Sequence, residues 1–145
     1  YIWHMTRIED IVANTLINGT YQVLFEHGFD ISIKSPIITT GNELMRDQLE
    51  AFSKVLDINE LYRYYITVYE TTTTIIKSLK KCISEETKHK LISLNVVSTD
   101  KDAFWLVNYW CNKNYLGLLQ MPFSRHLIMH TEGCIRIYKK IKNDG

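Results

Sequence analysis

The 145-residue sequence contains no apolar run of 18 or more residues, so it predicts no membrane-spanning helix. It also lacks a basic and apolar leader with a small-residue cleavage site, and we therefore expect no secretion. Internal repeats, Gly-rich phosphate loops, CxxC pairs and Ser-His-Asp patterns do not stand out either. The sequence thus carries no motif signal for loop-based nucleotide binding, for CxxC chemistry or for triad hydrolysis.

The sequence also has no large excess of positive or negative charge. The chain has 17 Lys and Arg against 16 Asp and Glu, for a formal charge of +1. Proteins that bind nucleic acids normally carry a basic face, so we expect no nucleic-acid partner. Cysteine is scarce, and the three cysteines are far apart on apolar helix faces: Cys82, Cys111 and Cys134. This odd set predicts reduced thiols and a cytoplasmic protein rather than a disulfide framework.

What the sequence does contain is a hydrophobic fraction of 46%, enough for a core and typical of one domain spanning residues 1–145. Apolar residues recur with helical spacing almost throughout. The brief alternation at 31–38 contains Pro36, which argues against a strand. We therefore predict an all-α bundle. The expected helices span 1–18, a short turn at 21–27, 42–55, 58–82, a weaker 84–97, 100–119 and 122–142.

Local signals define several of these elements. Asn18-Gly19 is a helix-ending signal, and Thr40 or Asn42 is expected to cap the helix that ends near residue 55. Pro122 is expected to start the final helix. The longest helix is predicted to bury one stripe, made of Leu61, Tyr65, Val68, Thr72, Ile75, Leu79 and Cys82. The aromatic segment around 104–115 is expected to form core or a dimer face rather than a ligand pocket.

The histidines suggest a metal site. His126 and His130 lie four residues apart on the predicted last helix, and such residues share one helix face. Two imidazoles so placed can bind one divalent ion, but a catalytic site needs a third protein ligand and an open position. His4 is the candidate third ligand, whereas His27 and His89 are expected at the surface.

Helix faces provide the context for this pairing, which would be weak evidence alone. His130 belongs to an apolar stripe with Leu127, Cys134 and Ile137, and His4 belongs to one with Ile8. All three histidines are therefore predicted to face inward. A shared ion would satisfy three inward imidazoles more economically than three separate hydrogen bonds.

Four segments carry a likeness to a known family: WHMTRIED, TTGNELMRDQLEAF, LYRYYITVYETTTTIIKSL and PFSRHLIMHTEG. In this order and spacing, with Trp-His-x-x-Arg near the start, the chain resembles the DinB/YfiT-like family over nearly its whole length. The resemblance implies a four-helix bundle in up-down-down-up order, often a homodimer. It also implies zinc or nickel, held by the residues that map to His4, His126 and His130. The family's first helix is expected upstream of Tyr1.

The chain departs from the family pattern at one place. Members often have a further histidine one turn on, followed by Arg-Gly-Gln, where this chain has Cys134-Ile-Arg-Ile. His130 with Cys134, also four residues apart, therefore stays open as an alternative ligand pair.

Three functions remain in competition. The resemblance favours a metal-dependent thiol S-transferase of the bacillithiol type, which would act on a small-molecule thiol and an electrophile, with Arg7, Tyr64 or Tyr65 as candidates for orienting substrate. A metal-dependent hydrolase would use the same histidines but needs a general base, for which only Glu9 or Glu132 is a nearby candidate in the sequence. A non-catalytic helical dimer, a stress-related binding module, would use the Trp105 and Trp110 face.

Overall fold

The computed structural model describes residues 1–78 and 93–143, and these residues form helices and connecting loops without any strand. The all-α prediction is therefore confirmed for the described part of the chain. Most of the helix expected at 84–97 lies outside the described residues, as do Leu79, Cys82 and His89. Within the described part, no helix is both long enough and apolar enough to cross a lipid bilayer.

The first long helix lies at the centre of the fold. It consists of α1, Ile2–Asp10, which continues directly into η1, Ile11–Asn18, a π-helical stretch. Gly19 ends it with a φ of +69°, the left-handed conformation that glycine adopts without steric cost. Every residue from 11 to 17 is buried, so this helix is covered on most of its sides. The predicted end at Asn18-Gly19 is confirmed.

Three short helices and a loop follow. Two of the helices are α2, Val23–Glu26, and α3, Phe29–Ser32. The third is α4, Arg46–Val55, which begins later than predicted. Gln48 Oε1 accepts a hydrogen bond from the Met45 N–H at its start, so neither Thr40 nor Asn42 caps it.

The described part of the longest helix is α5, Ile58–Ser78. Asp57 Oδ1 accepts hydrogen bonds from the backbone N–H groups of Asn59 and Glu60, as expected for a residue that caps a helix N-terminus. The predicted stripe is confirmed at Leu61, Val68, Thr72 and Ile75, but the buried tyrosine is Tyr64, whereas Tyr65 is only partly buried. The buried residues of α5 are Leu61, Tyr64, Val68, Thr72 and Ile75.

The C-terminal part is broken into more pieces than predicted, namely α7, Trp105–Cys111, α8, Tyr115–Phe123, and α9, Arg125–Asn143. Instead of one helix over 100–119 there is a break, after which Asn114 Oδ1 accepts a hydrogen bond from the Gly117 N–H and caps α8. Pro122 lies inside α8 and does not start the last helix. The chain leaves helical geometry at Ser124, with φ −138° and ψ −115°.

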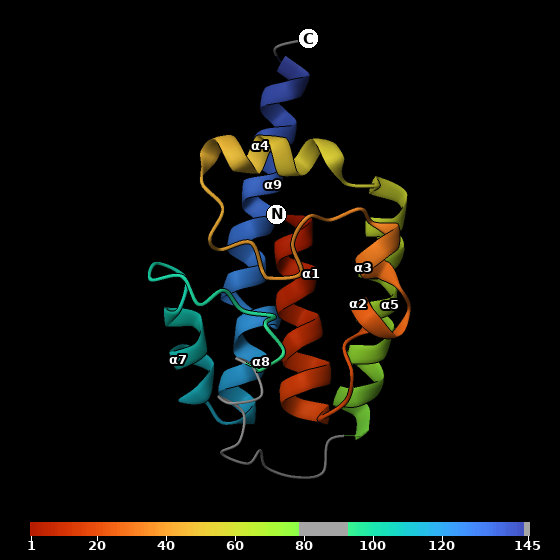
Figure 1. Cartoon of the computed structure of the whole chain (residues 1–145), viewed down its shortest axis with the longest axis vertical. Coiled ribbons are helices and arrows are strands. Elements are labelled where there is room, and N and C mark those ends of the chain that lie inside the picture. The colour runs from red at the N-terminus through yellow and green to blue at the C-terminus, as the bar shows by residue number, and fades with distance from the viewer. Residues whose placement is uncertain (79–92, 144–145) are drawn as a thin grey trace.

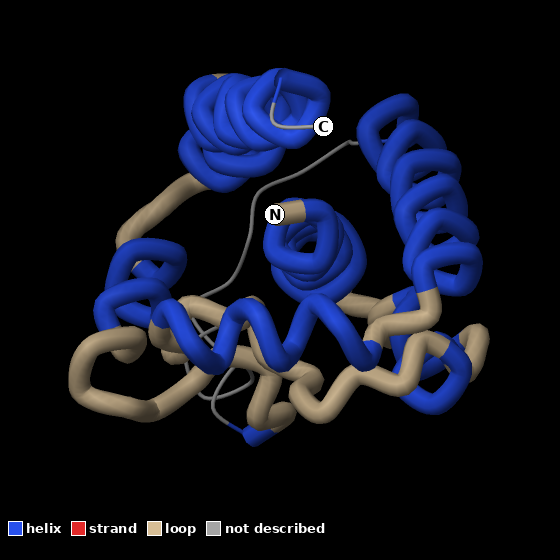
Figure 2. The backbone as a smooth tube through the Cα atoms, turned by 90° about the horizontal axis from the view of Figure 1, so that it is seen from above, coloured by secondary structure: helices blue, strands red, loops and turns tan. Residues whose placement is uncertain are grey.

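The long helices lie side by side (Figures 1 and 2), as expected for a helical bundle. α1–η1 and α5 run in the same direction and α9 runs in the opposite one, while α4 crosses near one end (Figure 1). α5 packs against α1 and η1, and α8 packs against η1 and α9. Seen from above, α1 lies between α5 and α9 (Figure 2).

The last helix is much less covered than its sequence pattern predicts. No residue of α9 is buried, and its partly covered positions include His126, His130 and Cys134. Ile137 and Ile141, which belong to the predicted inward stripe, are 50% and 69% exposed. The expectation that this stripe is buried is wrong for the described chain, because an apolar face is buried only where another element covers it.

Candidate metal centre

A buried polar network surrounds Arg7, which lies three residues after His4 in α1. The Arg7 guanidinium has no solvent exposure, and its Nη1 contacts Asp10 Oδ2 at 3.3 Å and donates to the Tyr64 hydroxyl at 3.0 Å. Its Nη2 donates to Gln22 Oε1 at 2.7 Å. Asp10 in turn accepts hydrogen bonds from two backbone N–H groups, those of Val23 and Leu24. Arg7 therefore forms an ion pair with Asp10 within α1, and every one of these polar groups has a partner as burial requires.

The same network pins a distant loop against α1. Arg7 Nε and Nη2 both donate to the Ile38 carbonyl, at 2.9 and 2.7 Å. One residue further on, the Thr39 carbonyl accepts a hydrogen bond from the Trp3 indole at 3.0 Å. These bonds hold residues 38–40 beside the first turn of α1. Because Arg7 and Tyr64 are buried and used in this way, neither can reach a substrate, and their suggested orienting role is wrong.

The pinned loop sets the orientation of the His4 ring. His4 Nδ1 lies 2.8 Å from the Thr40 carbonyl oxygen. A carbonyl can only accept a hydrogen bond, so Nδ1 carries the proton in the neutral ring and Nε2 keeps a free lone pair. A histidine that donates one ring N–H to a backbone carbonyl and presents its other nitrogen outward has the usual arrangement of a metal ligand.

The three predicted histidines meet at one place. His4 Nε2 lies 3.2 Å from His126 Nε2, and His130 Nε2 lies 3.1 Å from the same atom. Ligand atoms from all three rings lie within 4.8 Å of one another, and the three residues could hold a metal ion. The predicted convergence of the two ends of the chain is therefore confirmed.

These distances match the chemistry of a tetrahedral metal. Zinc binds imidazole at about 2.0–2.1 Å, which places two ligand nitrogens of a tetrahedral site about 3.3 Å apart. The observed 3.1 and 3.2 Å separations are within about 0.2 Å of that value. Without an ion, His126 Nε2 can form only one N–H···N hydrogen bond with its two neighbours, so the other short contact would have no hydrogen bond. The residues present thus fit a divalent ion, with one position left open.

The protonation state also suits metal binding. Burial lowers the pKa of His4, although the hydrogen bond to Thr40 acts in the opposite direction. Burial and the neighbouring imidazoles lower the pKa values of His126 and His130 to about 4. The three rings are therefore neutral at pH 7, which is the form that binds a metal.

The Tyr1 side chain packs against α9 beside the histidines. A Cβ atom added at Gly133 would lie 3.1 Å from the Tyr1 ring, tighter than most real contacts. The Tyr1 ring also lies beside His130, with ring centroids 5.1 Å apart. Glycine at 133 therefore leaves room for the Tyr1 ring beside His130.

The other residues that the sequence suggested as ligands or as a general base lie outside the histidine group. Cys134 does not belong to the histidine group and lines a neighbouring cavity instead. The alternative ligand pair is therefore not supported by the geometry. No carboxylate of residues 1–78 and 93–143 belongs to the group either, and Glu132 faces solvent beside Arg136. His27 is exposed, as expected.

The residue that sequence reasoning missed is Thr40, whose carbonyl orients His4. No periodic pattern marks it, because it lies in an irregular loop. Its proximity to His4 depends on Trp3 and Arg7, which bond to the carbonyls of the two preceding residues.

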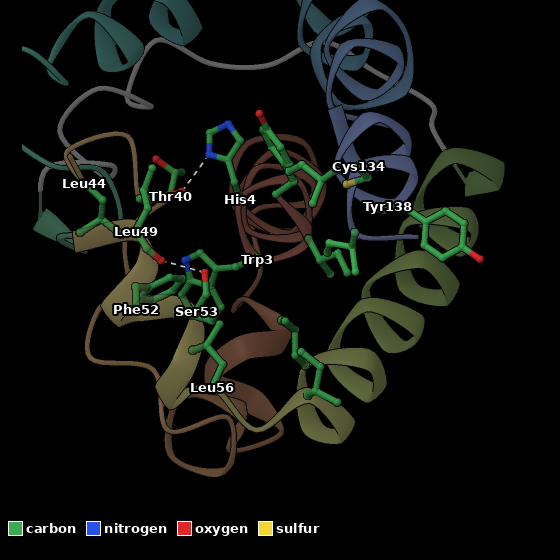
Figure 3. A pocket seen from close by; sticks show the side chains of 17 residues that line it. Trp3, His4, Thr40, Leu44, Leu49, Phe52, Ser53, Leu56, Cys134 and Tyr138 are labelled. Carbon is green, nitrogen blue, oxygen red and sulfur yellow. Dashed lines mark hydrogen bonds between the residues drawn. The ribbon is translucent and has the colours of Figure 1, made fainter. Parts of the chain in front are cut away.

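Two cavities adjoin the histidine group on different sides. The first, between α1, α4, α5 and α9, includes His4 and Cys134 and is shown in Figure 3. The second has a volume of about 530 Å³, and its lining mixes polar with apolar and aromatic side chains: Tyr109, Gln120, Met121, Ser124, Arg125, His126 and Met129. The histidine group can thus be approached from two cavities.

The comparisons leave the family open. The chain matches no family model, and it has no significant match among curated proteins or solved structures. The resemblance to the DinB/YfiT-like family therefore stays a prediction that rests on the four quoted segments. Conclusions about function depend on the geometry of the histidine group and its cavities.

Proposed function

We propose that this chain is a DinB-like, metal-dependent enzyme that holds zinc or nickel through His4, His126 and His130. The observation that carries the proposal is the convergence of three Nε2 atoms, with 3.1 and 3.2 Å between His126 and its two neighbours. The direction of the long helices supports the fold part of the proposal, since α1–η1, α5 and α9 run down, down and up (Figure 1), in the order of the last three helices of the family bundle.

We further propose that the reaction is the transfer of a small-molecule thiol, of the bacillithiol type, to an electrophile. A divalent ion in the site would lower the pKa of a thiol at the open position, so that the thiol is deprotonated near neutral pH. Two cavities beside the histidine group support a reaction with two substrates. The charged Arg125 in the cavity beside His126 suits a hydrophilic thiol, and the cavity beside His4 suits the electrophile.

The protein's own residues orient the histidine rings and line the cavities beside them. The Thr40 carbonyl holds the His4 ring in the tautomer that presents Nε2. The Tyr1 ring packs beside the His130 ring, and residues of α4 line the cavity beside His4. The hydrolase alternative has no comparable support, because no carboxylate among the described residues joins the histidine group to act as a base.

Metal binding is the first test. The protein is stripped with a chelator and titrated with zinc and with nickel by calorimetry, beside His130→Ala and the matched variant Cys134→Ser one turn away. We expect one equivalent to bind the wild type, His130→Ala to lose binding at least tenfold and Cys134→Ser to stay within threefold. If the wild type binds less than a tenth of an equivalent, the metal site is refuted.

The thiol reaction is tested separately. Metal-loaded protein is assayed with bacillithiol or glutathione and monochlorobimane, and in parallel with a panel of esters without thiol. Turnover that needs both thiol and metal supports the transferase, whereas ester hydrolysis without thiol would move the assignment to the hydrolase.

The homodimer is also retained as a proposal. Exposed apolar side chains along α9, among them Ile128, Met129 and Ile135, support it. Trp105 on α7 is also exposed, at 52%, but Trp110 is not. Trp110 is buried and its indole contacts Met121 Sδ at 3.1 Å, so it belongs to the core.

A further inference from the structure

The cavity beside His4 has a shape suited to a small molecule. Its volume is about 380 Å³, within the usual range for ligand sites. Trp3 and His4 come from α1, Phe52 and Ser53 from α4, and Cys134 from α9 (Figure 3). We call this space the apolar cavity.

The chemistry of the walls restricts what it can hold. Among the residues that the structure describes, His4 is the one Asp, Glu, Lys, Arg or His side chain that lines the apolar cavity. Trp3, Phe52 and Leu61 contribute buried apolar surface, and Leu44 and Leu56 extend it. A charged ligand would lose its hydration there without gaining a charged partner, so the walls favour an uncharged molecule.

One wall residue offers an unused polar group. Thr40 is 1% exposed, and its hydroxyl oxygen is buried without a hydrogen-bond partner, although its carbonyl binds His4. A buried hydroxyl left unpaired costs free energy, and such groups in native proteins usually have a partner. A ligand with one polar group at this end of the apolar cavity would supply that partner.

We propose that the apolar cavity binds an uncharged, largely hydrocarbon substrate with a single polar group, held with that group beside Thr40 and His4. This inference rests on the proposed function, because it makes this molecule the electrophilic substrate. The hydrocarbon part lies against Phe52, Leu56 and Leu61, and the polar end lies nearest the histidine group.

Binding is tested on metal-free protein with N-phenyl-1-naphthylamine, an uncharged fluorescent probe. The key variant is Leu49→Glu, because Leu49 lines the apolar cavity but is 46% exposed, so the change does not disturb the core. Val55→Glu is the matched control, on the same helix and 50% exposed but not lining the cavity. We expect saturable binding that weakens at least tenfold in Leu49→Glu and less than twofold in Val55→Glu, with unchanged helical circular dichroism.

The polar end is tested by displacing the probe with 1-octanol. Thr40→Val keeps the shape and the carbonyl that binds His4 but removes the hydroxyl. Octanol should bind this variant about fivefold more weakly, as expected for one lost hydrogen bond, while the probe itself binds within twofold of wild type. Equal octanol affinity in both proteins would overturn the assignment of the polar end to Thr40.

The two proposals fail in different ways. Absence of saturable probe binding, or equal loss in both glutamate variants, overturns the apolar cavity as a substrate site and leaves zinc titrations unchanged. Probe binding that follows the expected pattern in a protein that binds no zinc would support the ligand site and refute the metal-dependent reaction. His126→Ala should lose zinc and keep the probe, because His126 does not line the apolar cavity.

Discussion

The two helices that supply the histidines are built in opposite ways. α1 with η1 is buried along most of its length and contains a fully paired polar network around Arg7 and Asp10. α9 has no buried residue, and its ion pair, Arg136 with Glu132, is exposed. One ligand of the candidate metal site is therefore held by the core of the fold, and two come from a lightly packed helix. We infer that α1 sets the position of the site and that bound metal attaches α9 to it.

The largest expected effect on stability comes from breaking the buried ion pair of α1 rather than the exposed one of α9. Asp10→Ala leaves the buried Arg7 charge without its partner and should cost about 3–5 kcal/mol of unfolding free energy. Glu132→Ala breaks an exposed pair 3.6 Å long and should change stability by less than about 0.5 kcal/mol. Urea denaturation measures both. A loss below about 1 kcal/mol for Asp10→Ala would contradict the structural role given to the network.

Metal should stabilise the link between the two helices. With free zinc at 100 times its dissociation constant, the unfolding free energy should rise by about 2.7 kcal/mol, because only the folded chain brings the three histidines together. Thermal unfolding with and without chelator measures this. His4→Ala and His126→Ala should both lose the gain, and Cys134→Ser should keep it. A gain that survives in His4→Ala would mean that α9 binds the ion alone.

The same isoleucine-to-valine substitution on each helix compares how much side-chain packing contributes to stability there. Ile11→Val in η1 removes a methylene from a fully buried side chain and should cost about 0.5–1.5 kcal/mol. Ile128→Val in α9 makes the same change at a side chain that is 60% exposed, and it should cost almost nothing in the monomer. Both are measured by urea denaturation at low protein concentration. A cost at Ile128 that grows with protein concentration would support the proposed homodimer.

The smallest effect concerns Glu9, on the side of α1 toward α5. Burial raises the pKa of this carboxyl, and one of its oxygens has no hydrogen-bond partner. The folded chain therefore holds this proton more tightly than the unfolded chain, so stability falls as pH rises above about 4.5 toward the raised pKa. Glu9→Gln removes this loss, and its unfolding midpoint should exceed that of wild type by a few degrees at pH 7.5 and by less at pH 4.5. An equal difference at both pH values would contradict a raised pKa.

Sequence periodicity was most reliable where one helix is covered on most sides. The helix from Tyr1 to Asn18 ended where Asn-Gly predicts, because glycine at a left-handed position stops a helix whatever surrounds it. The stripe on α5 was predicted correctly except at one position, where Tyr64 is buried instead of Tyr65. Pro122 gave the wrong start for α9, since local sequence does not show whether a proline begins a helix or is tolerated near the end of the one before it.

By itself, the sequence determined the all-helical character of the described chain, through the spacing of apolar residues, and it placed His126 and His130 on one helix face. The meeting of His4 with that pair was decided by tertiary structure. The Tyr1 ring packs against Gly133 of α9 beside these histidines, and Arg7 and Trp3 hold the loop that orients His4 against α1. Helical spacing in the sequence predicts contacts between residues a few positions apart. The contact between residues 4 and 126 arises only from the packing of distant elements. Packing also decides how much of α9 remains exposed.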